Sequence, residues 1–147
     1  MNKFFFYSLC ALIIYAPIPL GANRIWASST IEFFVFAIFT VHLLSTIKAK
    51  RTFLPPAYSL AIIVPLSLTV LWLLIQITPG LGLVLGRSFS TLSYDPSLTH
   101  IMLLKTLALT MFAWLLFYYV NTKALVYKIT LTILLSGLLQ ALYASWL

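Results

Sequence analysis

Five long runs of hydrophobic residues divide the chain, separated by short stretches that contain charged residues, proline or glycine. The runs cover residues 4–20, 25–47, 57–77, 101–120 and 125–147. A helix needs about 20 mostly apolar residues to cross a bilayer, so each run is long enough, although the first is short. No run alternates as a barrel strand does, and backbone groups in lipid must bond within their own segment. We therefore expect an all-α fold: a polytopic membrane helix bundle of about five transmembrane helices in one domain, residues 1–147.

The first run follows Lys3, and signal peptides also place a short basic region before a hydrophobic core. Pro17 and Pro19 lie near the end of this run, and the sequence shows no Ala-x-Ala cleavage pattern there. Four further apolar runs follow along the chain. These features favour an uncleaved first span over a cleaved signal peptide.

Basic residues are unevenly divided between the stretches that separate the runs. Successive stretches fall on opposite sides of a membrane, and lysine and arginine are retained on the cytoplasmic side during insertion. One side carries Lys3, Lys48, Lys50, Arg51, Lys123 and Lys128, and the other carries Arg24, Arg87 and Lys105. This six-to-three division predicts a cytoplasmic N-terminus, outer loops at residues 21–29 and 78–100, and a C-terminus on the outer face.

Two features support the boundaries of the runs. Asp95 and Pro96, near the end of the outer stretch 78–100, form the pattern of a helix N-cap followed by proline at the first helical position. The fourth helix should therefore begin at this pair, and the rest of the stretch should lie on the outer interface. Aromatic residues also lie toward the run ends, as amphipathic rings do at headgroup level. These residues are Trp26, Trp72, Tyr94, Tyr118, Tyr119, Tyr127 and Trp146.

Composition strengthens the membrane interpretation. The chain has 63% hydrophobic and 7% charged residues and a mean hydropathy of +1.08, whereas a soluble domain carries about a quarter charged residues. The formal charge of +7 would indicate nucleic acid in a soluble protein. Here the basic residues flank apolar runs, which indicates contact with anionic lipid and no nucleic-acid partner. The single cysteine, Cys10, forms neither an intramolecular disulfide nor a cysteine metal site.

Glu32 is the one acidic residue inside an apolar run, and an ionisable residue at that depth is a functional candidate. A structural role is equally open, because the carboxylate could reach the interface or pair with Arg24 of the preceding loop. His42 lies about 15 Å further along a helix and about 80° around it, so it cannot touch Glu32. We interpret His42, and His100 before the fourth run, as structural histidines.

Arg24 and Arg87 in the outer loops are candidate ligands for a phosphate or pyrophosphate, because guanidinium presents a planar fork of donors. Interfacial anchoring is the alternative role. With Glu32, these two arginines are the predicted substrate-binding residues. The sequence has no paired carboxylates, no Ser-His-Asp set and no metal-ligand spacing, so we expect no catalytic residue, metal or cofactor in this chain.

Small residues recur in the fifth run at a spacing that places them on one face of a helix. They are Ser136, Gly137, Ala141, Ala144 and Ser145. Small residues at positions i, i+4 and i+8 let membrane helices approach closely. We expect this face to pack against a partner helix.

Three marked segments occur in order along the chain. Residues 15–26 read YAPIPLGANRIW, residues 92–99 read LSYDPSLT and residues 137–143 read GLLQALY. They resemble the PLPLGxNRPWAW, SLDP-x-x-T and G-x-x-Q-A-L-Y-G patterns of the O-antigen ligase-like membrane proteins. In that family the patterns lie at the first outer turn, before the fourth helix and in the fifth helix. The resemblance therefore spans nearly the whole chain.

The resemblance implies a glycosyltransferase of the bacterial inner membrane. Such an enzyme moves a glycan from a polyprenyl pyrophosphate carrier to lipid A core, or to another acceptor, on the periplasmic side and without a metal. The family continues into further helices and a large periplasmic segment with catalytic arginines and a histidine, which this chain lacks. The chain would then be an N-terminal portion, inactive alone and partnered by a C-terminal half, with Arg24 as its motif-matched functional residue.

Two other classes of protein stay open. One is a small membrane interaction protein that docks its fifth helix on a larger complex and performs no chemistry. The other is a transporter or channel, which the few polar residues within the runs favour less. An adjacent reading frame that encodes more helices and an outer loop would favour the glycosyltransferase, and its absence would favour the interaction protein.

Overall fold

The computed structural model describes residues 2–17, 25–50, 52–84 and 91–146. These residues form six α-helices and contain no strand, which confirms the all-α prediction. The helices are α1 (Asn2–Tyr15), α2 (Ile25–Lys48), α3 (Leu60–Ile77), α4 (Leu81–Val84), α5 (Pro96–Tyr119) and α6 (Lys123–Trp146). One turn of 3-10 helix, η1 (Ala57–Ser59), leads into α3.

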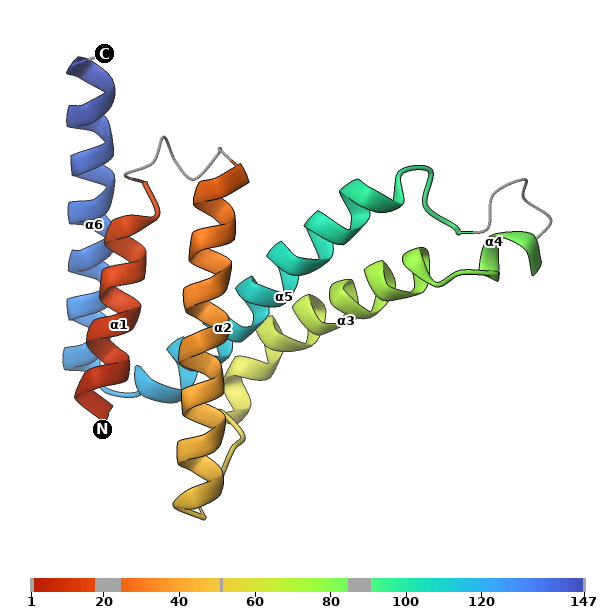
Figure 1. Ribbon diagram of the computed structural model, residues 1–147. Coiled ribbons are helices and arrows are strands. Elements are labelled where there is room, and N and C mark those ends of the chain that lie inside the picture. The colour runs from red at the N-terminus through yellow and green to blue at the C-terminus, as the bar shows by residue number, and fades with distance from the viewer. Residues whose placement is uncertain (1, 18–24, 51, 85–90, 147) are drawn as a thin grey trace.

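The helices form two groups (Figure 1). α1, α2 and α6 run side by side, and α3 and α5 form a hairpin that leaves them at an angle, with α4 at the far end of the hairpin. α5 joins the two groups because it packs against α1, α2 and α3, whereas α6 packs against α1. Three of the described helices, α1, α2 and α5, therefore meet at one place.

In the described part of the chain, four helices are long and apolar enough to cross a membrane. These candidate spans are Trp26–Lys48, Ala57–Ile77, Pro96–Tyr119 and Lys123–Tyr143. They indicate a multi-pass membrane protein and agree with four of the five runs expected from the sequence. The first run, expected at 4–20, gives a helix that ends at Tyr15, and residues 18–20 lie outside the described part. At 1.5 Å per residue, its 14 residues reach only about 21 Å, less than the roughly 30 Å of a hydrocarbon core.

α5 begins at Pro96, as the Asp95-Pro96 pair predicted. The carboxylate of Asp95 accepts hydrogen bonds from the Ser97 hydroxyl and, at 3.0 Å, from the backbone N–H of Leu98. These two donors hold the pKa of Asp95 below its ordinary value. α5 therefore includes residues 96–100 of the stretch expected on the outer side, because capping starts the helix before the apolar run that begins at residue 101. The stretch also contains the single turn α4.

The buried side chains form three clusters, and α1 contributes to each. Phe5 and Leu9 of α1 pack with Leu115 and Tyr119 of α5. The second cluster joins Phe6 to Val120 and Ile129, and the third joins Leu12 to Val35 and Ala108. α3 buries only Ile63 among its described residues. The short first helix is thus the centre of packing, and α3 lies on the outside.

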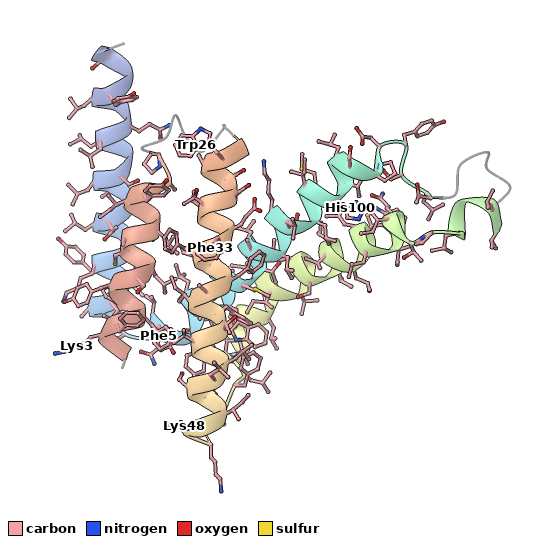
Figure 2. The ribbon with its side chains drawn as sticks, viewed as in Figure 1. Lys3, Phe5, Trp26, Phe33, Lys48 and His100 are labelled. Atoms are coloured by element: carbon pink, nitrogen blue, oxygen red, sulfur yellow. The ribbon has the colours of Figure 1, made fainter. Side chains whose placement is uncertain are left out.

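One end of the α1, α2 and α6 group is basic (Figure 2). Lys3 and Lys48 both lie at this end, where α1 and α6 begin and α2 ends. Lys123 is the first residue of α6, and Lys128 lines a cavity together with Lys3. The lysines expected on one side of the membrane therefore gather at one end. The arginine expected with them, Arg51, lies outside the described residues. The cytoplasmic location of this end stays a prediction.

Candidate functional site

Glu32 lies in a groove formed where α1, α2 and α5 meet. It is the eighth residue of α2, and Lys105 is the tenth residue of α5. Both side chains line one cavity of about 350 Å³. Leu12, Val35 and Ala108, the third buried cluster, form part of its wall. The groove is therefore apolar except for Ser28, Glu32 and Lys105.

Lys105 and Glu32 carry opposite charges and line the same cavity. Opposite charges inside a membrane favour each other because neither is well solvated there. The sequence offered Arg24 as a partner for Glu32, but Arg24 lies outside the described residues. A signal for Lys105 was present in the sequence: counted from the starts of their helices, Glu32 and Lys105 differ in depth by only about 3 Å. Two lone opposite charges at similar depth are natural partners.

Small side chains leave the groove open. Ala16, Ser28 and Ala108 line it, and they occupy less volume than the leucines and phenylalanines around them. The cavity volume of about 350 Å³ falls within the range of roughly 300–1,000 Å³ that holds small molecules. A mostly apolar groove of this volume suits a hydrocarbon chain.

The other two predicted binding residues, Arg24 and Arg87, lie outside the described residues. The structure therefore places Glu32 of the predicted set of three and says nothing about its distance from either arginine. Among the described residues, no three His, Cys, Asp or Glu side chains lie close enough together to hold a metal ion.

His42 is fully buried, with 0% of its surface exposed. Its Nδ1 lies 2.8 Å from the hydroxyl of Tyr119, while its Nε2 has no hydrogen-bond partner among the described residues. His42 is therefore a core residue and not an interfacial one, and only one of its nitrogens is bonded. His100 is exposed on α5 (Figure 2), with Nδ1 2.6 Å from the carbonyl oxygen of Pro96. Its contact is local to the first turns of α5, as a structural histidine requires.

Aromatic rings surround His42 at the basic end of the bundle. Phe5 stacks on Tyr119 with ring centroids 4.6 Å apart, and Phe53 stacks on Trp114 at 4.8 Å. The hydroxyl of Tyr118 donates to the carbonyl of Thr52 at 3.0 Å. Tyr119 packs inside the bundle at this end, because only 8% of its surface is exposed. The position of Tyr119 at the end of an apolar run could not distinguish an interfacial ring from one that packs α5 against α1 and α2.

The small-residue face of α6 has two different surroundings. Ser136 is buried, and its hydroxyl donates to the carbonyl of Ile13 in α1 at 2.9 Å. A Cβ atom at the next residue, Gly137, would meet nothing within 4 Å. The expected partner helix is therefore α1 for one edge of this face, while the edge at Gly137 is open in the described part of the chain.

Comparison with known proteins gives this geometry no relative. No family model, curated protein or solved structure matches the chain. Four candidate spans, a groove lined by one acidic and one basic side chain, and a buried aromatic cluster are the features from which a function can be inferred.

Proposed function

We propose that this chain is the N-terminal membrane portion of an O-antigen ligase-like glycosyltransferase. The enzyme would transfer a glycan from a polyprenyl pyrophosphate carrier on the periplasmic side of the bacterial inner membrane. The groove between α1, α2 and α5 is the observation that carries the proposal. In this role the groove holds part of the isoprenoid chain, and the catalytic residues belong to a C-terminal half.

The motif resemblance supports the proposal through the elements on which the motifs fall. The second motif, residues 92–99, contains the Asp95 cap that starts α5. The third motif, residues 137–143, lies within α6. The first connects α1 to α2, and residues 18–24 of it lie outside the described part. The Asp95 cap gives the second motif a physical role, the start of α5, which would explain why the family pattern contains an aspartate there.

The chemistry of the groove supports an isoprenoid ligand. Its walls are apolar, and Glu32 and Lys105 together add no net charge. Lys105 has a flexible four-carbon stem that can extend toward the membrane surface and meet a phosphate there. In the proposed complex, Lys105 joins Arg24 and Arg87 in contacting the pyrophosphate, while Glu32 releases the ammonium group as the ligand arrives.

Binding of long-chain polyprenyl pyrophosphate to the detergent-solubilised full chain tests this role. Leu109→Trp places a large ring in the groove, since Leu109 lines it and is 54% exposed. We expect this variant to lose most binding. Leu104→Trp is the matched control, because Leu104 is 46% exposed on the same helix and does not line the groove. Equal binding by both variants would contradict the groove as the site.

A pull-down of the tagged chain from native membranes tests the partner. Mass spectrometry should identify a polypeptide with additional helices and a large outer loop. Recovery of the chain alone, or of an unrelated complex, would contradict a divided glycosyltransferase. The assembled enzyme then allows a test of Arg24→Ala, which should weaken donor binding; unchanged transfer would exclude Arg24 from the donor site.

A non-enzymatic interaction subunit is the second candidate, favoured by the open edge at Gly137. Membrane helices associate through close backbone approach at small residues, and a side chain at this position would prevent it. Gly137→Leu should abolish recovery of a partner if α6 is the docking face. Two results together would favour this candidate over the glycosyltransferase. Gly137→Leu would lose the partner, and Leu109→Trp would leave polyprenyl binding unchanged.

A further inference from the structure

A second cavity lies at the basic end of the bundle, away from the groove of Glu32. Its volume is about 560 Å³, and α1, the stretch before η1, the end of α5 and the start of α6 enclose it. Lys3 of α1 and Lys128 of α6 line it, together with Asn121 between α5 and α6. The two cavities lie toward opposite ends of α1. The first residues of this helix line the second cavity, and its last residues line the groove.

The charged side chains described at this end are all basic. Lys48 and Lys123 add to the two lysines of the cavity, and Lys3 and Lys48 are visible at this end in Figure 2. The sequence contains two acidic residues, and neither is here: Glu32 lines the groove and Asp95 caps the start of α5. α1 and α6 begin at this end while α2 and α5 end there, so the helix dipoles largely cancel and the lysines set the sign of the charge. The cavity is therefore suited to an anion.

The walls indicate what else the ligand contains. Phe6 is buried beside the cavity, and Leu125 and Pro55 add apolar surface. Tyr7 also lines it and is 63% exposed, so the cavity continues onto the lipid-facing surface of α1. An inorganic phosphate would use the lysines and leave these walls in contact with water. A molecule with an anionic head and hydrocarbon tails would use both.

We propose that this cavity binds the phosphodiester headgroup of an anionic phospholipid from the leaflet at the basic end. Lys3 and Lys128 contact the phosphate, Asn121 donates to its oxygens, and the acyl chains lie along the apolar surfaces of α1 and α6. The lipid then bridges the start of α1 to α6 and to the end of α5. This site is independent of the proposed glycosyltransferase, because it shares no lining residue with the groove.

Native mass spectrometry of the detergent-solubilised full chain tests the proposal. The probes are dioleoyl phosphatidylglycerol and dioleoyl phosphatidylcholine, which share acyl chains and differ in net charge. We compare the wild type with Lys3→Gln/Lys128→Gln and with a control, Lys48→Gln/Lys50→Gln. The control removes the same charge from the same end but changes no residue that lines the cavity. All four lysines are exposed, so the variants should fold, which a melting curve of each verifies.

We expect the wild type to retain phosphatidylglycerol over phosphatidylcholine. The cavity variant should lose about tenfold or more of this affinity, since each lysine near a membrane surface contributes measurably to anionic lipid binding. The control variant should lose much less. Equal retention of both lipids, or equal losses in the two variants, would overturn the site in favour of general electrostatic attraction. Competition by inorganic phosphate at the same affinity as the lipid would also overturn it, in favour of a free anion.

Discussion

α1 and α3 are both apolar helices, and their surroundings differ sharply. α1 has 14 residues, and four of its large side chains are buried: Phe5, Phe6, Leu9 and Leu12. α3 belongs to the candidate span with the highest mean hydropathy, 2.4. Only one of its described residues, Ile63, is buried. In lipid, contact between two helices removes no apolar surface from water, so association depends on van der Waals fit and hydrogen bonds. Hydropathy therefore predicts which segments enter a bilayer, and side-chain shape decides which of them pack together.

The largest test of this difference removes one leucine from each helix. Leu9 is 0% exposed on α1, and Leu71 is 53% exposed on α3. Leu9→Ala should lower the free energy of unfolding by about 2–5 kcal/mol, because it leaves a cavity. Leu71→Ala should change it by less than about 0.5 kcal/mol. Denaturant titration in detergent measures both values. Similar losses at the two sites would show that a further helix, besides α5, covers the exposed face of α3.

A tyrosine pair extends the test to polar groups. Tyr119→Phe removes the hydroxyl bonded to His42 and leaves a buried imidazole with less hydrogen bonding. We expect a loss of about 1–3 kcal/mol, the cost of an unsatisfied buried polar group. Tyr58→Phe is the control, because Tyr58 in η1, just before α3, is 64% exposed and should tolerate the change. Full stability of Tyr119→Phe would mean that the hydrogen bond to His42 does not stabilise the α1 side of the bundle.

A smaller effect is expected where α6 meets α1. Ser136→Ala removes the hydrogen bond to Ile13, and interhelical bonds of this kind contribute about 0.6 kcal/mol on average. Thr69→Ala in α3 removes a hydroxyl that donates to Pro65 of its own helix at 2.9 Å. That change should have almost no effect, because it breaks no contact between helices. The same denaturant titration applies, and a larger loss at Thr69 would reverse the assignment of α3 to the exterior.

The smallest effect concerns the end of the hairpin between α3 and α5. The pKa of Asp95 is lowered in the folded chain, so its cap stabilises α5 fully above the unfolded pKa of about 3.9. That stabilisation is lost as the pH falls through the lower, folded value. NMR titration of the carboxyl carbon should show a midpoint below about 3.9. Ser97→Ala removes the main cause and should raise the midpoint; an unchanged midpoint would assign the shift to other donors.

The sequence was sufficient for the positions of the long helices and for one helix start. Apolar runs predicted α2, α3, α5 and α6, and Asp95-Pro96 predicted the first residue of α5 because capping is a local interaction. The length of α1 was wrong, since the apolar run continues past Tyr15 while the described helix ends there.

The packing of the helices could not be predicted in the same way. A soluble helix marks its buried face by contrast with a polar face, but a helix in lipid is apolar all around. The sequence therefore gave no sign that Leu9 is buried and Leu71 exposed. The pairing of Glu32 with Lys105 needed a comparison of depth on two helices that are far apart in the chain. Tyr119 needed knowledge of its neighbours, which its place at a run end does not provide.

The contact between the first helix and the last one has a consequence for the order of assembly. A ribosome adds about 5–20 residues per second, so the stretch between the end of α1 and the start of α6 takes several seconds to synthesise. During that time the short α1 is in the membrane without the helix that covers one of its sides. Until α6 is synthesised, the side of α1 that later contacts α6 faces lipid or an insertion factor. The contact between α1 and α6 can therefore form only after the helices between them have been synthesised.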